Sequence, residues 1–163
     1  MVDDQSPTAS GKMISKLTEA GIECYKVALT SVSIVMPKIT KVIVDSYAVM
    51  ADGGILGFSG VFAVAMMAKE YSVPFLVVSP LYKLTPKYCF SQQTFNTLLN
   101  PSIIHKESNK PGDENLSIAV PKFDYLPPEY ITLHITQKGD QTTAYIYRLF
   151  NEIYTKDEMN ADF

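Results

Sequence analysis

Two short apolar runs dominate the hydrophobic pattern of the chain. They are Val42-Ile43-Val44 and Phe75-Leu76-Val77-Val78, both rich in β-branched residues and bounded by Pro, Gly or charged residues. Such runs are typical of strands buried in a parallel sheet. Between them, a glycine-bearing turn at Ala51–Gly54 precedes an apolar segment from about Phe58 to Tyr71 that indicates a helix. The pattern predicts one right-handed βαβ crossover over residues 41–80.

The predicted helix of this unit is apolar on nearly every side, and Lys69 and Glu70 are its charged residues. A surface helix of a monomer normally carries a polar face. One side is therefore expected to pack on the sheet. The other side packs either on a second layer or another protein chain, or the helix is buried wholly within its own domain. Both alternatives stay open at this point.

Upstream of the crossover, the pattern predicts a polar leader and three short elements. They are a flexible leader over residues 1–10, a helix from Lys12 to Ala20 ended by Gly21, a strand from Ile22 to Leu29, and a helical turn from Ser31 to Met36 stopped by Pro37. The order α-β-α-β-α-β indicates an α/β domain with a mostly parallel sheet and helices on both faces. Because doubly wound sheets begin on a strand, we expect the domain to be truncated at its N-terminus.

Downstream of Pro80, the chain is less regular until its last third. The expected elements are a long loop at Ser91–Ser117 with a helical turn near Phe95–Leu99 and a turn at Pro111-Gly112, a rigid two-proline turn at Lys122–Glu129, a strand at Tyr130–Thr136 near a sheet edge, a turn at Gly139-Asp140, and an amphipathic helix at Ala144–Tyr154. The apolar stripe of that helix is Ile146, Leu149, Phe150 and Ile153.

Composition narrows the class of protein. The 163 residues suit one domain, and a hydrophobic share of 47% is enough for a core. A net charge of -3 and a pI near 5.3 argue against a nucleic-acid partner. Cys24 and Cys89 match no metal or redox spacing and indicate free thiols in a reducing compartment. No apolar run is long enough for a bilayer, so we expect a cytoplasmic protein without a membrane partner.

The glycines before the central helix form a degenerate phosphate-binding pattern. Gly53, Gly54, Gly57 and Gly60 read G-G-x-x-G-x-x-G rather than G-x-G-x-x-G. A helix N-terminus still favours an anion, so Gly53, Gly54, Ser59 and Gly60 are candidate anion-binding residues. The alternative is a tight turn that needs glycine for its dihedral angles. The pattern predicts no cofactor.

Other candidate chemistry is sparse. His105 and His134 have no Cys, His or carboxylate at ligand spacing, so no metal site is predicted. Asp45, Asp52 and Asp124 lie near expected strand ends, where α/β sites form. A lone carboxylate there is more often a turn or cap residue than a catalyst. No nucleophile–base pair is visible, so no catalytic residue is predicted.

Four segments carry a resemblance to a known family. They are Lys41 to Pro80, PLYKLTP at 80–86, FDYLPPEYITLHIT at 123–136 and AYIYRLFNEIY at 144–154. Over residues 11–158 the chain resembles the regulatory subunits of eukaryotic translation initiation factor 2B, a family that includes methylthioribose-1-phosphate and ribose-1,5-bisphosphate isomerases. PLYKLTP and YIYRL are most similar to the C-terminal domain of its beta-type members. The resemblance implies a Rossmann-like domain over 11–158, followed by a tail at 159–163.

The resemblance also tests an enzymatic role. The isomerases carry a turn written A-N-G-D-x-x-N-K-x-G-T, and here it reads ADGGILGFSGV at 51–61. Gly54 stands at the catalytic aspartate, and Gly57 and Phe58 stand at the asparagine–lysine pair that holds the sugar phosphate. Glycine transfers no proton and phenylalanine neutralises no phosphate. Leu29 stands roughly where relatives place an aspartate, which weakens a polar crevice further.

What the resemblance implies is a non-catalytic regulatory domain of the guanine-nucleotide exchange factor that acts on translation initiation factor 2. Implied partners are a delta subunit by direct pairing, the gamma, epsilon and alpha subunits, and the substrate factor, whose phosphorylation the regulatory core senses. The expected interface residues are Phe123, Asp124, Tyr125, Pro127, Tyr145, Tyr147 and Arg148. For any one tyrosine, the alternative is that it covers its own core. Two other functions stay open: a sugar-phosphate isomerase or small-metabolite-binding relative, and a homodimeric binding module.

Overall fold

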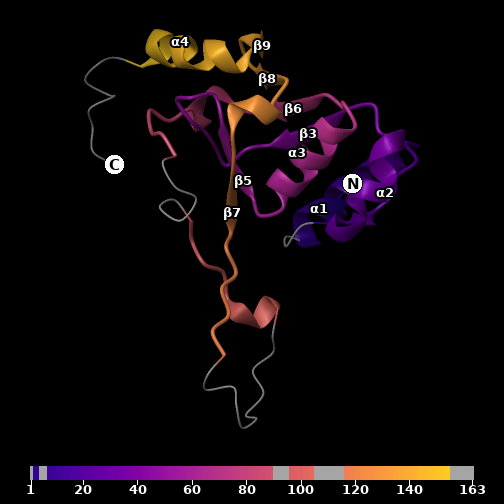
Figure 1. Ribbon diagram of the computed structural model, residues 1–163. Helices are drawn as coiled ribbons and strands as arrows, with labels where there is room; N and C mark the ends of the chain where they lie inside the picture. The colour runs from indigo at the N-terminus through magenta and orange to yellow at the C-terminus, as the bar shows by residue number, and fades with distance from the viewer. Residues whose placement is uncertain (1, 4–6, 90–95, 105–115, 155–163) are drawn as a thin grey trace.

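The computed structural model describes residues 2–3, 7–89, 96–104 and 116–154, with side-chain burial from residue 11 onward. Its main sheet has the order β3-β6-β8-β9. The strands are β3 (Val42–Asp45), β6 (Phe75–Val78), β8 (Leu133–Thr136) and β9 (Gly139–Gln141). The first three run parallel, and β9 pairs antiparallel to β8 at the edge. Helix α3 (Val61–Glu70) connects β3 to β6, which confirms the predicted βαβ unit (Figure 1).

A second, antiparallel sheet was not predicted. Its order is β4-β5-β7, formed by β4 (Ala48–Val49), β5 (Ile55–Phe58) and β7 (Phe123–Leu126). Phe58 therefore belongs to a strand and not to the central helix, and β7 replaces the first half of the rigid turn expected at 122–129. Phe123 and Leu126 are buried, and β7 pairs with β5. That long-range pairing is stronger than the local turn signal of the two prolines, which begin a 3-10 turn at Pro128–Tyr130.

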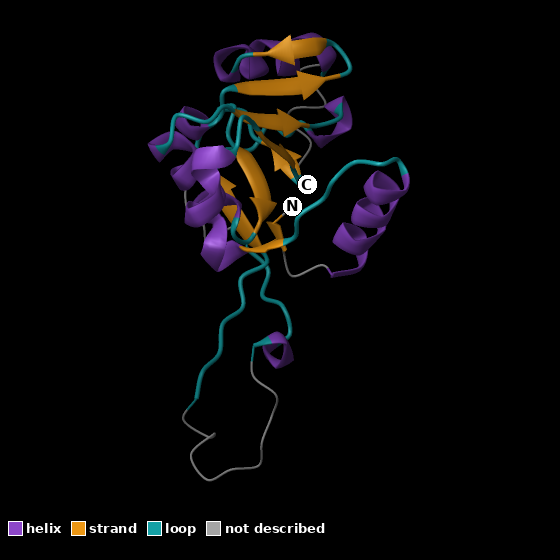
Figure 2. Cartoon of the chain, turned by 90° about the vertical axis from the view of Figure 1, so that its right-hand side faces the viewer, coloured by secondary structure: helices purple, strands orange, loops and turns teal. Residues whose placement is uncertain are grey.

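Helices flank the strands on both sides, as the α/β pattern predicts (Figure 2). α1 (Pro7–Glu19) and α2 (Val32–Val35) precede the main sheet, with 3-10 turns at Leu29–Ser31 and Met36–Lys38. Two further 3-10 turns lie at Leu81–Lys83 and Pro101–Ile103. α4 (Thr143–Ile153) lies beside β8 and β9 (Figure 1).

Several predicted boundaries are wrong. α1 begins at Pro7, inside the expected leader, and the strand expected at 22–29 shrinks to β2 (Val27–Ala28), which pairs with β1 (Val2–Asp3) outside the main sheet. Gly139 and Asp140 lie in β9, and the turn is at 137–138. Residues 96–99 hold no helical turn, since residue 98 forms a β-bridge. The turn predicted at Pro111-Gly112 lies outside the described residues.

One hydrophobic core joins the sheets and helices. The stripe predicted for α4 points inward, with Ile146, Leu149 and Phe150 buried and Ile153 packed against them. α3 buries Ala65 and Ala68 almost completely, whereas Met66 is 44% exposed. The alternative that α3 is buried wholly within its own domain is therefore wrong.

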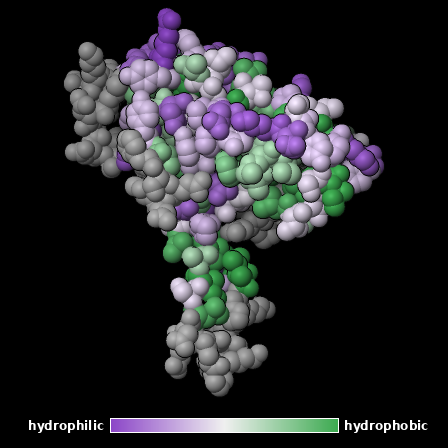
Figure 3. Space-filling model, viewed as in Figure 1, coloured by the Kyte–Doolittle hydropathy of each residue, from purple (hydrophilic) through white to green (hydrophobic). Residues whose placement is uncertain are grey.

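A narrow arm extends from this body (Figures 1 and 2). Residues 96–99 run antiparallel to 120–123, joined by bonds from Leu99 N–H to Val120 O (2.8 Å) and from Lys122 N–H to Thr97 O (2.9 Å). Figure 3 shows that apolar side chains gather on the arm, and the exposed ones are Leu98, Ile103, Ile104 and Leu116. In the part of the chain that the structure describes, no helix combines the length and the apolar character needed to cross a membrane.

Candidate functional site

The turn between β4 and β5 is crowded by the chain's own atoms. Asp52 Oδ1 accepts a hydrogen bond from Gly54 N–H (2.8 Å), and Asp52 Oδ2 accepts one from the Tyr125 hydroxyl. A β-carbon built on Gly54 would lie 2.8 Å from both Leu126 O and Tyr125 Cε2. Burial and the bond to Asp52 raise the pKa of Tyr125. The Tyr125 ring thus occupies the space that a side chain at position 54 would need.

His134 also binds the turn between β4 and β5. Its Nε2–H donates to the Gly53 carbonyl at 2.9 Å, and its side chain is completely buried. Burial lowers the pKa of His134, so the imidazole is neutral. A β-carbon on Gly53, whose φ is 84°, would collide with the Thr143 carbonyl. The glycine therefore serves close packing between the turn and the start of α4.

The N-terminus of α3 already has an anion. The backbone N–H groups of Gly60 and Phe62 donate to Asp124 Oδ2 at 2.6 and 3.4 Å. Free amides and the helix dipole favour negative charge at this position. Gly60 has φ 103°, which suits glycine. Asp124 comes from β7 and therefore joins the second sheet to the central helix.

The four candidate anion-binding residues do not converge on one site. β5 separates the turn that contains Gly53 and Gly54 from the turn that contains Ser59 and Gly60. In the first turn, Tyr125 and Thr143 occupy the nearby space. In the second turn, Asp124 accepts the hydrogen bond from the Gly60 N–H that an anion would otherwise receive. The geometry favours the alternative interpretation, in which these glycines serve tight turns and close packing.

The predicted interface residues on β7 make contacts within the chain. Phe123 is only 4% exposed and contacts the ring of Tyr47 at a centroid distance of 4.4 Å. Asp124 and Tyr125 make the bonds described above, and Pro127 is half-buried at the start of a 3-10 turn. Within this chain Phe123 is a core residue, and its role at an interface stays a prediction.

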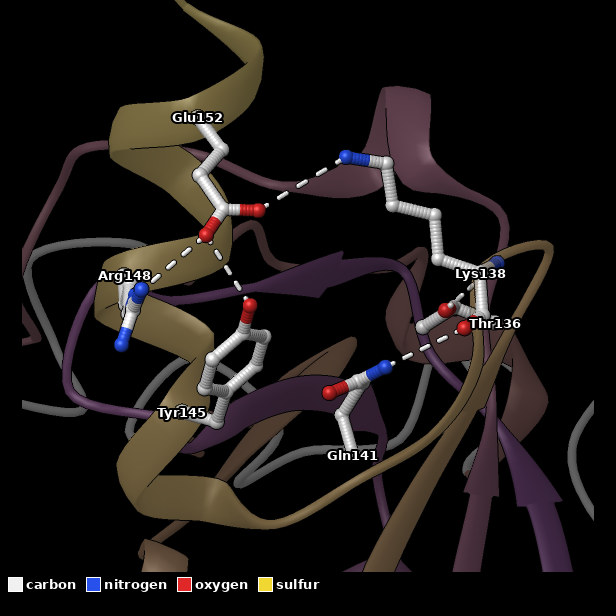
Figure 4. Close-up of polar contacts among 6 residues, drawn as sticks. All are labelled: Thr136, Lys138, Gln141, Tyr145, Arg148 and Glu152. Carbon is white, nitrogen blue, oxygen red and sulfur yellow. Dashed lines mark hydrogen bonds and ion pairs between the residues drawn. The ribbon is translucent and has the colours of Figure 1, made fainter.

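Two of the predicted interface residues on α4, Tyr145 and Arg148, belong to a polar cluster around Glu152 (Figure 4). Glu152 Oε1 accepts from the Tyr145 hydroxyl (3.0 Å) and from Arg148 Nε (3.3 Å), and Lys138 Nζ lies 3.8 Å from Oε2. The hydrogen bond to Glu152 raises the pKa of Tyr145. Arg148 is engaged through Nε, and Tyr147 is 55% exposed beside it. Both side chains remain accessible on the helix surface.

A buried serine pair was missed by the sequence analysis. Ser46 and Ser79 directly follow the parallel strands β3 and β6, and their hydroxyls are 2.9 Å apart. Lys83 donates to the Ser46 carbonyl and lies 4.0 Å from Asp45. A serine after each of two parallel strands was the available signal, because the carboxyl ends of such strands meet. Among the described residues, no group of three or more His, Cys, Asp or Glu side chains is placed to hold a metal ion.

Comparison with known proteins places these features in a family. The beta subunit of translation initiation factor eIF2B from Dictyostelium discoideum is 36% identical over 163 residues, which cover 99% of this chain and 42% of the relative. The alpha and delta subunits from the same organism are 30% and 32% identical over 88% and 85% of this chain, and over 47% and 24% of their own lengths. The chain thus spans less than half of these relatives.

An enzyme and a solved structure are also similar. A ribose 1,5-bisphosphate isomerase from Pyrococcus furiosus is 28% identical over 85% of this chain and 44% of its own length. The crystal structure of eIF2B beta from Chaetomium thermophilum superposes with a TM-score of 0.72 at 21% identity, covering 96% of this chain and 42% of that one, which confirms the Rossmann-like fold. The profile of the Initiation factor 2 subunit family matches residues 1–143. The chain belongs to the Initiation factor 2 subunit family.

Proposed function

We propose that this chain is a non-catalytic regulatory domain of the guanine-nucleotide exchange factor that acts on translation initiation factor 2. Its similarity to a beta subunit over 99% of its length supports a beta-type role. In this role it pairs with a delta subunit, and the gamma, epsilon and alpha subunits complete the complex in the cytoplasm. The domain senses phosphorylation of the substrate factor as part of that regulatory core.

The observation that carries this proposal is the filled space at Gly54. An isomerase of this family needs an acidic side chain at this position and a cation at Phe58. Tyr125 and Leu126 leave no room for an acidic side chain at position 54. Phe58 is 41% exposed and carries no positive charge. A proton-transfer group must reach its substrate, and a site packed with the chain's own atoms offers none. This supports a role for the domain in assembly with other subunits.

The helix α4 is the proposed contact with the delta subunit. Tyr and Arg are enriched among the residues that contribute most binding energy at interfaces. Tyr147 and Arg148 are exposed, and the bond from Arg148 Nε to Glu152 restricts the side chain before binding. Ordering an arginine in advance lowers the entropy cost of association. The planar guanidinium still presents its terminal amino groups, which suit a carboxylate on the partner.

The combined variant Tyr147→Ala and Arg148→Ala tests this contact. We expect binding to the delta subunit to weaken by at least about tenfold, because each side chain is a candidate anchor. Co-expressed subunits are to be compared by titration, with Tyr82→Ala combined with Lys12→Ala as control, since both side chains are exposed and lie outside α4 and the Glu152 cluster. Unchanged affinity of the α4 variant places the contact elsewhere.

The regulatory role is tested by nucleotide exchange. Complex purified from the protein's own cells is to be compared with complex depleted of this subunit, using GDP release from translation initiation factor 2. The proposal predicts that the phosphorylated substrate factor inhibits the intact complex and loses that inhibition after depletion. Equal inhibition of both preparations would contradict a regulatory role for this chain.

The second candidate is a sugar-phosphate isomerase, or a small-metabolite-binding relative, favoured by the similarity to the Pyrococcus enzyme. Its direct test is product formation from ribose 1,5-bisphosphate and from methylthioribose 1-phosphate, monitored by phosphorus NMR, with calorimetry for binding alone. We expect neither turnover nor heat of binding. Turnover that is lost in Asp52→Asn would support the isomerase and contradict the assembly role.

A further inference from the structure

A groove lies between the C-terminal end of α3 and the segment that leads into β8. It is lined by two short segments, and the lining residues are Lys69, Ser72, Val73 and Pro74 on one side and Glu129, Tyr130, Ile131 and Thr132 on the other. Its volume is about 340 Å³, which is in the size range of small-ligand sites. The turns around Gly54 and Gly60 and the proposed contact on α4 use none of these residues.

Contacts within the chain bridge the groove at both ends. At the end nearer the sheet, Thr132 N–H donates to Phe75 O (2.8 Å), and Phe75 N–H donates to Thr132 Oγ1 (3.0 Å). At the other end, Lys69 Nζ lies 3.9 Å from Glu129 Oε1. The two sides are therefore held at a fixed spacing before a ligand binds, which lowers the entropy cost of binding. The Thr132 oxygen accepts a bond, so its own proton can still donate.

One wall of the groove is aromatic and rigid. The Tyr130 ring meets the edge of Phe62, with ring centroids 5.3 Å apart and an interplanar angle of 70°. Lys69 Nζ lies 4.3 Å from the centroid of the Tyr130 ring. Val73 and Ile131 belong to or pack against the hydrophobic core and add apolar surface. The groove thus offers an ammonium, a carboxylate and apolar surface within one small space.

The two charged side chains retain capacity to bind a ligand. Lys69 and Glu129 are 53% and 64% exposed, and their separation of 3.9 Å is long for an ion pair, so the pair itself contributes little to stability. A small molecule that carries a carboxylate and an ammonium on the same carbon can replace this one long contact with two short, charge-assisted hydrogen bonds. A peptide cannot do so, because an amide bond removes one of the two adjacent charges.

We propose that this groove binds a free α-amino acid with an apolar side chain. The ligand carboxylate accepts hydrogen bonds from Lys69 Nζ and from the hydroxyls of Ser72 and Thr132. The ligand ammonium donates to Glu129, and the apolar side chain packs on Val73. This inference is independent of the proposed function, which places the delta subunit on α4.

The backbone of Ser72 is a second, separate observation. Its φ is 55°, and among the described residues it is the one non-glycine residue with a positive φ. The position directly after a helix in this conformation usually holds glycine or asparagine. Strained conformations of this kind cluster at ligand-binding and active sites. A serine retained here places a hydroxyl beside Lys69, whose carbonyl accepts the Ser72 N–H at 3.1 Å.

Heteronuclear NMR titration of the labelled full chain with leucine tests the site. We expect saturable shifts of the amide signals of the residues that line the groove, with a Kd on the order of 1 mM. N-acetyl-leucinamide keeps the side chain and lacks both charges, so it should bind at least about tenfold more weakly. No shifts of these signals at roughly 20 mM leucine, or equal binding of the neutral analogue, would overturn the proposal.

Three variants assign the contacts. Lys69→Met and Glu129→Gln each remove one charge and should weaken leucine binding at least about fivefold, whereas Lys12→Met, on the exposed surface of α1, should leave it unchanged. Ser72→Gly separates binding from folding. Its urea midpoint should rise, because glycine adopts a positive φ without strain, while leucine binding weakens. Full leucine affinity in both charge variants and in Ser72→Gly would contradict the site.

Discussion

Gly54 illustrates how the space at a single position can be filled by the chain's own atoms. Leu126 O and Tyr125 Cε2 each lie 2.8 Å from the place where a β-carbon on Gly54 would stand. Tyr125 is held there by its hydroxyl bond to Asp52. Atoms of Tyr125 and Leu126 therefore occupy the space beside Gly54 in this turn.

Gly54→Ala should destabilise the fold by about 1–3 kcal/mol, because the added methyl group overlaps a carbonyl and a fixed ring. Gly11→Ala is the matched control, since Gly11 lies in α1 with nothing within 4 Å of its β-carbon position. That control should leave stability unchanged or raise it by up to about 1 kcal/mol. Urea unfolding gives both values, and equal values would contradict the close packing at Gly54.

His134 makes stability depend on pH. Burial lowers its pKa in the folded chain from the ordinary 6.5. The unfolded chain consequently binds more protons below pH 6.5, and the free energy of unfolding falls as the pH drops toward the folded pKa. The slope contributed by this residue reaches at most about 1.4 kcal/mol per pH unit.

Urea unfolding between pH 8 and pH 5.5 measures this slope for the unmodified chain and for His134→Gln. The glutamine retains a donor for the Gly53 carbonyl but does not titrate. The variant should show a flatter decline, even if it is less stable at pH 8. An identical slope in both proteins would show that His134 is not responsible.

At the scale of elements, α3 depends on a residue from a distant strand. Asp124 on β7 accepts hydrogen bonds from the N–H groups of Gly60 and Phe62. The helix has no side-chain cap of its own, since the residue before Val61 is a glycine. The carboxylate thus satisfies free amides and complements the helix dipole at once.

Asp124→Asn should cost about 1–2 kcal/mol of stability, because the charge is lost while the shape is kept. Asp140→Asn, on the exposed strand β9, is the control and should change stability by less than about 0.5 kcal/mol. Thermal and urea unfolding measure both. If the two variants are equally stable, the contact of Asp124 with α3 contributes nothing measurable.

Elements with a local signal were predictable from the sequence, and elements made by distant pairing were not. The stripe of Ile146, Leu149 and Phe150 located α4 to within one residue at each end, and the β-branched runs located β3 and β6. β5 and β7 escaped prediction because each depends on the other across the sequence. The packing of Tyr125 beside Gly54 could not be predicted for the same reason, since Tyr125 lies 73 positions along the chain from its hydrogen-bond partner Asp52.

At the scale of the whole molecule, the exposed surfaces are the ones available to bind other chains. The turn at Gly54 is filled by Tyr125 and Leu126, and Asp124 occupies the N-terminus of α3. Apolar side chains gather on the exposed arm (Figure 3), and Tyr147 on α4 and Ile43 on β3 are exposed as well. Exposed aromatic and apolar side chains of this kind suit contacts with other chains.

The central claim, that this chain acts by assembling with exchange-factor subunits, is tested most directly by affinity capture of the tagged full chain from its own cells. Quantitative mass spectrometry of the eluate would measure what stays bound and in what ratio. The account predicts delta, gamma, epsilon and alpha subunits in near-equal amounts with this chain. Recovery of this chain alone, as a monomer or homodimer, would contradict it.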